Sequence, residues 1–173
     1  NKVPIFSSKL TLGFVEGKLS EFRIRAPKFR EVSDGSHITL GCMTIDFFSM
    51  THSIPGALGV FIKTPQGTVL HTGDFKLDVS PIGGEMMDLT RIGEYGRDGV
   101  LLLMCESTNV EHPGFTPSER KVGASLDRIF MTNTDKRIII ATFSSNVHRV
   151  QQIIDSSVKY GRKVAITGRS MIN

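Results

Sequence analysis

Four polar clusters in the sequence follow directly on strand-like runs, and their side chains could bind a metal ion or a phosphate. They are Thr51-His52-Ser53, Thr72-Gly73-Asp74, Glu106-Ser107-Thr108-Asn109 and Ser144-Ser145-Asn146-Val147-His148. Loops at strand ends often carry function, because the rigid strands fix the direction of the side chains. The first three clusters offer an imidazole and two carboxylates, which are metal ligands, and the fourth offers hydroxyl and amide donors.

His52, Asp74 and Glu106 each have an alternative interpretation that involves no chemistry. His52 lies in a loop, where its ring can bind a metal or hydrogen-bond the backbone. Asp74 follows a glycine that lets the backbone turn, so it can be a ligand or a turn cap. Glu106 comes two residues after an apolar run, where a carboxylate needs a cation or a histidine as partner. These groups are too few for a catalytic two-metal centre, so a metal site here would need further ligands elsewhere.

The cluster from Ser144 to His148 stands at the predicted start of a helix. The first N–H groups of a helix lack partners and the helix dipole is positive there, which suits a phosphate. The alternative is N-capping by Ser144, Ser145 or Asn146. No G-x-G-x-x-G or G-x-x-x-x-G-K-[ST] occurs, so the expected sequences of a dinucleotide site and a P-loop are absent.

The composition is that of a soluble globular protein, with 39% hydrophobic and 22% charged residues among 173. No apolar run reaches the roughly 20 residues of a membrane helix. Cys42 and Cys105 lie in apolar runs and form no C-x-x-C pair, which favours a reducing compartment. The net charge of +4 permits an acidic partner without requiring one. Part of it comes from FRIRAPKFR, residues 22–30, predicted as a strand with one basic, solvated face.

The first half of the chain is predicted to be rich in hairpins. Residues 8–20 weakly favour a helix, and residues 38–50 alternate as a strand does. Two further strands are predicted at 58–63 and 67–72, with a turn at Thr64-Pro65-Gln66-Gly67 between them. This arrangement implies an antiparallel sheet.

The second half shows a strand–helix alternation. Three strands are predicted, 99–104 (a type buried on both faces), 137–143 and 163–168. A helix from about 117 to 131 would begin with Thr116 as cap, Pro117 in the first turn and Glu119 completing a capping box. A second helix, about 147 to 160, would end at Gly161. The order implies a parallel sheet with right-handed crossovers.

Five motifs taken in order resemble the ribonuclease J family. They are THSIP, HTGDFK, ESTNVEHPGFTPSE, ATFSSNVHRVQQ and GRKVAITGRSM, and the resemblance is strongest over residues 45–173. It implies an α/β fold that comprises part of a metallo-β-lactamase αββα sandwich followed by the start of a β-CASP parallel α/β domain. Residues 1–112 would belong to the first of these domains and residues 113–173 to the second.

The same resemblance implies a role for each candidate residue. His52 and Asp74 match two of the family's metal-binding motifs, with Asp74 bridging two zinc ions or other divalent metals. Glu106 would orient a metal-ligating histidine, and Ser145, Asn146 and Val147 would contact RNA. The implied activity is 5′-to-3′ exoribonuclease, also endonuclease, in RNA decay and maturation in the cytoplasm. RNA with a 5′-monophosphate is the expected substrate, and a homo-oligomer or a hetero-oligomer with a paralogue the expected assembly.

The main metal motif of the family, H-x-H-x-D-H, does not occur in this sequence, and the first histidine is His37. The chain therefore resembles a middle piece of such an enzyme, and we expect it to be inactive alone. Two alternatives are a non-catalytic RNA-binding paralogue or subunit of the same fold and, less favoured by the motifs, a metallo-β-lactamase-like hydrolase of another substrate.

Overall fold

The computed structural model describes residues 3–24, 27–83 and 86–172. Their contacts divide the chain into two compact units. The sheet unit comprises the described residues of 1–52, 56–77 and 85–114, and the helical unit those of 53–55, 78–84 and 115–173. The change of unit near residue 114 lies close to the predicted domain boundary at 112, but the assignment of domains on either side stays a prediction.

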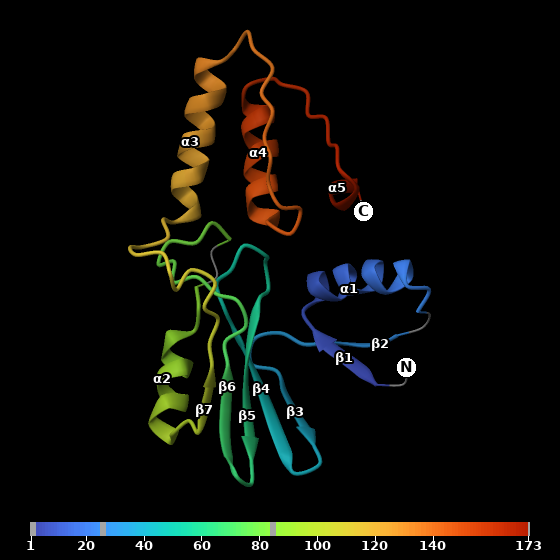
Figure 1. The fold of residues 1–173 in the computed structure, drawn as a ribbon, viewed down its shortest axis with the longest axis vertical. Helices are drawn as coiled ribbons and strands as arrows, with labels where there is room; N and C mark the ends of the chain where they lie inside the picture. The colour runs from blue at the N-terminus through green and yellow to red at the C-terminus, as the bar shows by residue number, and fades with distance from the viewer. Residues whose placement is uncertain (1–2, 25–26, 84–85, 173) are drawn as a thin grey trace. The chain divides into compact units, whose positions relative to one another are not determined.

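The sheet unit contains a five-stranded sheet in the order β3-β4-β5-β6-β7. Its strands are β3 (His37–Leu40), β4 (Met43–Ser49), β5 (Leu58–Thr64), β6 (Gly67–His71) and β7 (Leu102–Met104). Neighbours from β3 to β6 are antiparallel, whereas β7 runs parallel to β6. As a result β4, β6 and β7 all run in the same direction, and their C-terminal ends lie at the same edge of the sheet (Figure 1).

A second element of the sheet unit is a strand–helix–strand segment. β1 (Pro4–Ser7) pairs in parallel with β2 (Lys28–Glu31), and α1 (Lys9–Glu21) connects them. The helix predicted at 8–20 is thus confirmed, with Leu12 as its buried residue. The basic segment 22–30 is not one strand, because its strand begins at Lys28. Arg25, part of that prediction, lies outside the described residues.

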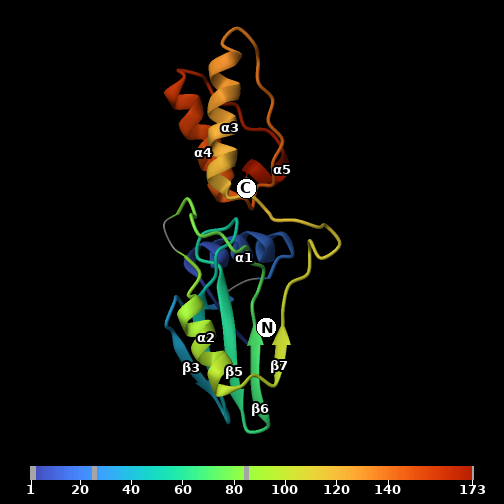
Figure 2. The ribbon, with the colours of Figure 1, turned by 90° about the vertical axis from the view of Figure 1, so that its left-hand side faces the viewer.

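Helix α2 (Leu89–Asp98) covers one face of the sheet over an aromatic core (Figure 2). The Tyr95 ring stacks on Phe61 at 3.8 Å between centroids and meets Phe48 edge-on at 5.7 Å. Both phenylalanines are fully buried, which stabilises the fold by about 1.5–3 kcal/mol for each side chain. Burial raises the pKa of Tyr95. Gly59 lies opposite Phe48, and a Cβ there would come within 2.3 Å of the ring.

The helical unit is built on two parallel helices, α3 (Glu119–Thr132) and α4 (Val147–Lys159). Glu119, at the start of α3, pairs with Arg149 near the start of α4 at 2.7 Å, and further along Asp127 pairs with Lys159 at 2.6 Å. The buried Phe130 packs its ring against that of Tyr160. A short helix, α5 (Arg169–Ile172), follows. Gly161, with φ of +64°, comes directly after the Tyr160 C-cap of α4, as predicted.

Two predicted strands are not formed. The structure describes all of 137–143 and 163–168 and assigns neither a strand. Both are extended segments that run beside the helices, in the direction opposite to α3 and α4 (Figure 1). Among the described residues no strand pairs with them, and Ile139 and Phe143 are 89% and 81% exposed. A strand requires a neighbour for its backbone hydrogen bonds, so the sequence pattern alone does not produce one.

Other boundaries also differ from the prediction. The strand expected at 38–50 is a hairpin, β3 and β4, turned at Gly41 with φ of +60°. The strand expected at 99–104 shortens to β7, which is exposed and lies last in the strand order rather than buried on both faces. Ser118, not Thr116, caps α3, and its side chain accepts from the Arg120 N–H. Strands β5 and β6 are confirmed within one residue.

Among the described residues, no helix has the length and apolar character of a membrane span.

Candidate functional site

The three candidate site residues of the sheet unit follow strands that end at one edge. His52 comes after β4, Asp74 after β6 and Glu106 after β7. The register places the strand ends side by side. His71 at the end of β6 pairs with Met104 of β7, and on its other side it pairs with a residue of β5 that in turn pairs near the end of β4. The three loops therefore emerge at one edge of the sheet, and the roles of His52, Asp74 and Glu106 stay predictions.

His52 and Asp74 are brought together by this arrangement. His52 Nε2 lies 3.9 Å from Asp74 Oδ2, a separation too long for a hydrogen bond. The His52 side chain is 32% exposed and that of Asp74 is 74% exposed, so both can reach a solute. An imidazole nitrogen and a carboxylate oxygen that face one another are two ligand atoms of the kind that zinc binds.

The described residues do not complete a metal site. Within the ranges that the structure describes, no group of three or more His, Cys, Asp or Glu side chains is placed to hold a metal ion. Catalytic zinc is held by three protein ligands, and the His52–Asp74 pair supplies two donors. The chemistry of the pair thus fits two positions of a metal centre, which would need further ligands.

The turn before Asp74 depends on Gly73. Gly73 has φ of +63°, a conformation that favours glycine, and a Cβ there would lie 3.1 Å from the Leu58 carbonyl oxygen. The buried Thr72 donates its N–H to the Met104 carbonyl at 3.1 Å, which ties the end of β6 to the end of β7. The predicted glycine turn is confirmed, and Asp74 directly follows it.

Glu106 makes a local contact. Its Oε2 accepts from the Thr108 N–H at 2.7 Å, and this bond lowers the pKa of the Glu106 carboxyl below its ordinary value. The nearby His52 lowers that pKa further, by a smaller amount. Glu106 is therefore within electrostatic reach of His52, while its hydrogen bond goes to its own loop. Its role in orienting a histidine stays a prediction.

Asn146 is the N-cap of α4 in the helical unit. Its buried side chain accepts from the Arg149 N–H at 3.1 Å, which confirms the capping alternative for this residue. Ser145 is exposed and Val147 partly buried. Arg149 forms two bonds with the Glu119 carboxylate, at 2.7 and 3.3 Å. Contact of Ser145, Asn146 and Val147 with RNA stays a prediction.

Sequence reasoning missed buried polar residues that hold these loops. Thr51 accepts the Lys76 N–H on its carbonyl at 2.7 Å and the Met87 N–H on its hydroxyl at 2.9 Å. In the helical unit, the buried Asp78 accepts the N–H groups of Ser80 and Glu119 at 3.0 and 3.4 Å. Met87 and Glu119 lie 36 and 41 positions from their partners, so no local pattern identifies these two bonds. The Asp-x-Ser spacing of Asp78 and Ser80 was the one available signal.

Comparison with known proteins gives consistent results. Residues 135–173 match the model of the ribonuclease J β-CASP domain. The chain is 48% identical to ribonuclease J of Thermus thermophilus over 173 residues and 47% identical to ribonuclease J of Mycolicibacterium smegmatis over 170. These alignments cover 98% of this chain and 30% of each relative. The chain thus spans less than a third of their length.

A solved structure shares the fold. A protein of unknown function from Enterococcus faecalis superposes with a TM-score of 0.67 over 88% of this chain and 39% of its own, at 19% identity. The predicted α/β fold class is confirmed, and residues 135–173 match a β-CASP domain.

Proposed function

Because the chain belongs to the ribonuclease J family, we propose that it supplies part of the active site of a metal-dependent ribonuclease. The observation that carries the proposal is the approach of His52 and Asp74 to 3.9 Å at one edge of the sheet. Two groups 22 positions apart meet there because β4 and β6 run in the same direction on either side of β5.

His52 and Asp74 are proposed metal ligands, and Asp74 would bridge two zinc ions or other divalent metals. When bound, such metals lower the pKa of a water molecule and stabilise the leaving oxygen of an in-line displacement at phosphorus. The positive-φ turn at Gly73 supports a ligand role, because it directs the backbone of Asp74 away from the end of β6 beside His52. Glu106, already ionised more readily than an ordinary glutamate, would orient a ligand histidine.

The proposed substrate is RNA with a 5′-monophosphate, degraded from 5′ to 3′ and also cut internally, in RNA decay and maturation in the cytoplasm. Contact would be made by Ser145, Asn146 and Val147 at the N-terminus of α4, where the helix dipole favours a phosphate. The exposed Ser145 hydroxyl supports this role. The complete protein is proposed to act as a homo-oligomer or with a paralogue.

A second candidate is a non-catalytic RNA-binding paralogue or subunit of the same fold. It is favoured by the incomplete donor set among the described residues. For the same reason we propose that the 173-residue chain alone is inactive. If the complete protein contains an intact H-x-H-x-D-H segment and binds metal, the ribonuclease is supported and the non-catalytic subunit is rejected.

The test compares the full-length protein with its Asp74→Ala variant. We expect the variant to lose bound zinc and at least about a hundredfold of the decay rate of 5′-monophosphorylated RNA, because loss of a ligand exceeds loss of an outer-shell partner. Asp98→Ala, an exposed acidic residue of α2, is the control and should retain both. Equal zinc content and equal rates in wild type and Asp74→Ala would reject the assignment.

A further inference from the structure

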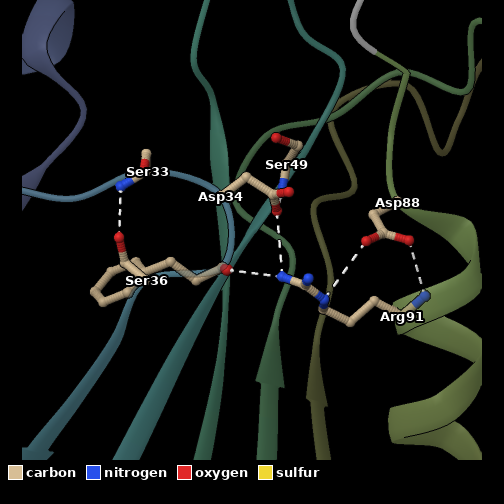
Figure 3. Close-up of polar contacts among 7 residues, drawn as sticks. Ser33, Asp34, Ser36, Ser49, Asp88 and Arg91 are labelled. Atoms are coloured by element: carbon tan, nitrogen blue, oxygen red, sulfur yellow. Dashed lines mark hydrogen bonds and ion pairs between the residues drawn. The ribbon is translucent and has the colours of Figure 1, made fainter.

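A network of polar contacts holds the end of β4, just before the loop that carries His52 (Figure 3). Ser49 is the last residue of β4, and both of its backbone polar groups are bound from outside the strand pair. Its N–H donates to Asp34 Oδ1 at 2.8 Å, and its carbonyl accepts the Asp88 N–H at 3.3 Å. The strand end is therefore fixed by the segment before β3 on one side and by the start of α2 on the other.

Arg91 joins these two anchors. Its Nη1 donates to Asp34 Oδ1 at 3.3 Å and to the Phe47 carbonyl at 3.4 Å, and its Nε lies 3.5 Å from Asp88 Oδ2 (Figure 3). Asp88 in turn caps α2, since its Oδ1 accepts the Arg91 N–H at 2.9 Å. A guanidinium can bind several acceptors in a fixed plane, which a lysine ammonium cannot reproduce. Arg91 thus makes Asp34, Asp88 and β4 one connected group.

The loop is held at each step from Ser49 to His52. The buried Met50 donates its N–H to the Ala57 carbonyl at 2.9 Å. Thr51 is bound to Met87, next to Asp88, and to Lys76, two residues after Asp74. The Lys76–Thr51 bond of 2.7 Å connects the His52 loop directly to the Asp74 loop. A displacement of Ser49 or of the α2 start would therefore change the distance between His52 and Asp74.

We infer that Arg91 and Asp34 are positioning residues for the His52–Asp74 pair, and hence for metal binding, which rests on the function proposed above. Neither touches the pair. They act through Ser49 and Thr51, which set where His52 stands relative to Asp74. Removing a group that hydrogen-bonds a metal ligand directly changes metal affinity by about 10- to 100-fold, and we expect an effect in this range to reach the pair through the backbone.

Positioning can be separated from folding here, because the network is partly exposed. The side chains of Arg91 and Asp34 are 31% and 45% exposed, and ion pairs in such surroundings contribute little to stability. The apo protein should therefore keep nearly the same melting temperature when they are changed. A purely structural role would lower the melting temperature and the metal affinity together.

The experiment measures zinc affinity of the full-length protein by competition with a chromophoric chelator, together with the melting temperature of the zinc-free form. Asp34→Ala and Arg91→Leu are expected to weaken zinc binding by about 10- to 100-fold. Asp34→Asn keeps an acceptor oxygen for the Ser49 N–H and should stay within about threefold of wild type. The control is Asp46→Ala on β4, which removes a 2.6 Å contact with His37 but none with Ser49.

The outcomes are distinct. Weakened zinc binding in Asp34→Ala and Arg91→Leu, rescue in Asp34→Asn and no change in Asp46→Ala support the inference. Unchanged affinity in Asp34→Ala and Arg91→Leu overturns it, as does an equal loss in Asp46→Ala with an equal fall in melting temperature. If wild type itself binds no zinc, or Asp74→Ala binds it as tightly, the proposed function fails instead.

Discussion

The sheet unit and the helical unit contain similar apolar segments that reach different structures. In the sheet unit, residues 58–64 and 67–71 pair with one another and with β4 and β7, and Phe61 becomes fully buried. In the helical unit, residues 137–143 and 163–168 have the same kind of sequence but no paired strand among the described residues, and Ile139 stays exposed. The two helices predicted in this unit, α3 and α4, are both formed, because the hydrogen bonds of a helix join residues close in sequence. The difference shows that a strand-like sequence gains its structure from a neighbour, whereas a helix is largely defined by its own residues.

The largest expected effect tests this comparison directly. Phe61→Ala should lower the free energy of unfolding by about 3–5 kcal/mol, because it removes a ring packed between Tyr95 and the sheet. Ile139→Ala in the 173-residue chain should change it by less than about 0.5 kcal/mol, since the side chain is 89% exposed. Urea denaturation followed by circular dichroism measures both. A cost of more than about 2 kcal/mol for Ile139→Ala would mean that this segment is packed in solution.

The features that the sequence predicted correctly depend on short-range patterns. The helix α1, the Gly161 end of α4 and the turn between β5 and β6 involve residues within a few positions of one another. The common edge of His52 and Asp74 was not among the predictions, although it follows from the strand order, because loops that follow strands of the same direction emerge at the same end.

The features that it missed depend on distant partners. Helix α2 contains Gly93 and Gly96, which weaken its helical pattern, and it is stabilised by Tyr95 packing on Phe61 across the sheet. The Ser49–Asp34 and Thr51–Met87 bonds join residues 15 and 36 positions apart. Such contacts arise from the folded arrangement, so composition and spacing give no signal for them.

A smaller effect concerns the local stabilisation of the helical unit. Asn146→Ala should lower the stability of α4 by about 1 kcal/mol, because the Arg149 N–H loses its acceptor. Asn146→Asp retains a carboxylate acceptor and should leave stability unchanged within about 0.5 kcal/mol. Thermal unfolding of the two variants measures this.

In the full-length protein, Asn146→Asp would add a negative charge beside bound phosphate, so weaker RNA binding with intact stability would separate the binding role from the capping role. Equal stability of both variants would show that Asn146 is no cap.

The smallest effect is a pH dependence in the contact between α3 and α4. The hydrogen bond from Lys159 lowers the pKa of Asp127, and the same bond raises the pKa of Lys159. Because the pKa of Asp127 is lowered, the contact contributes its full stability at pH values above the ordinary carboxyl pKa. This contribution is lost as the pH falls through the lowered pKa. Because the pKa of Lys159 is raised, the contact contributes its full stability at pH values below the ordinary lysine pKa. This contribution is lost as the pH rises through the raised pKa. The pair should therefore be complete at neutral pH and weaken at both extremes.

Lys159→Gln tests this pair without touching the core of the helical unit. In the variant, the pKa of the Asp127 carboxyl should rise toward its ordinary value, which an NMR titration of the side chain measures. Added salt should produce a change in the same direction in the wild type, because both side chains are exposed to solvent. An Asp127 pKa that is the same in both proteins would show that α3 and α4 do not meet at this point in solution. The comparison between the units would then change, because the helical unit would depend on the Phe130–Tyr160 packing and on the Glu119–Arg149 pair to hold its two helices together.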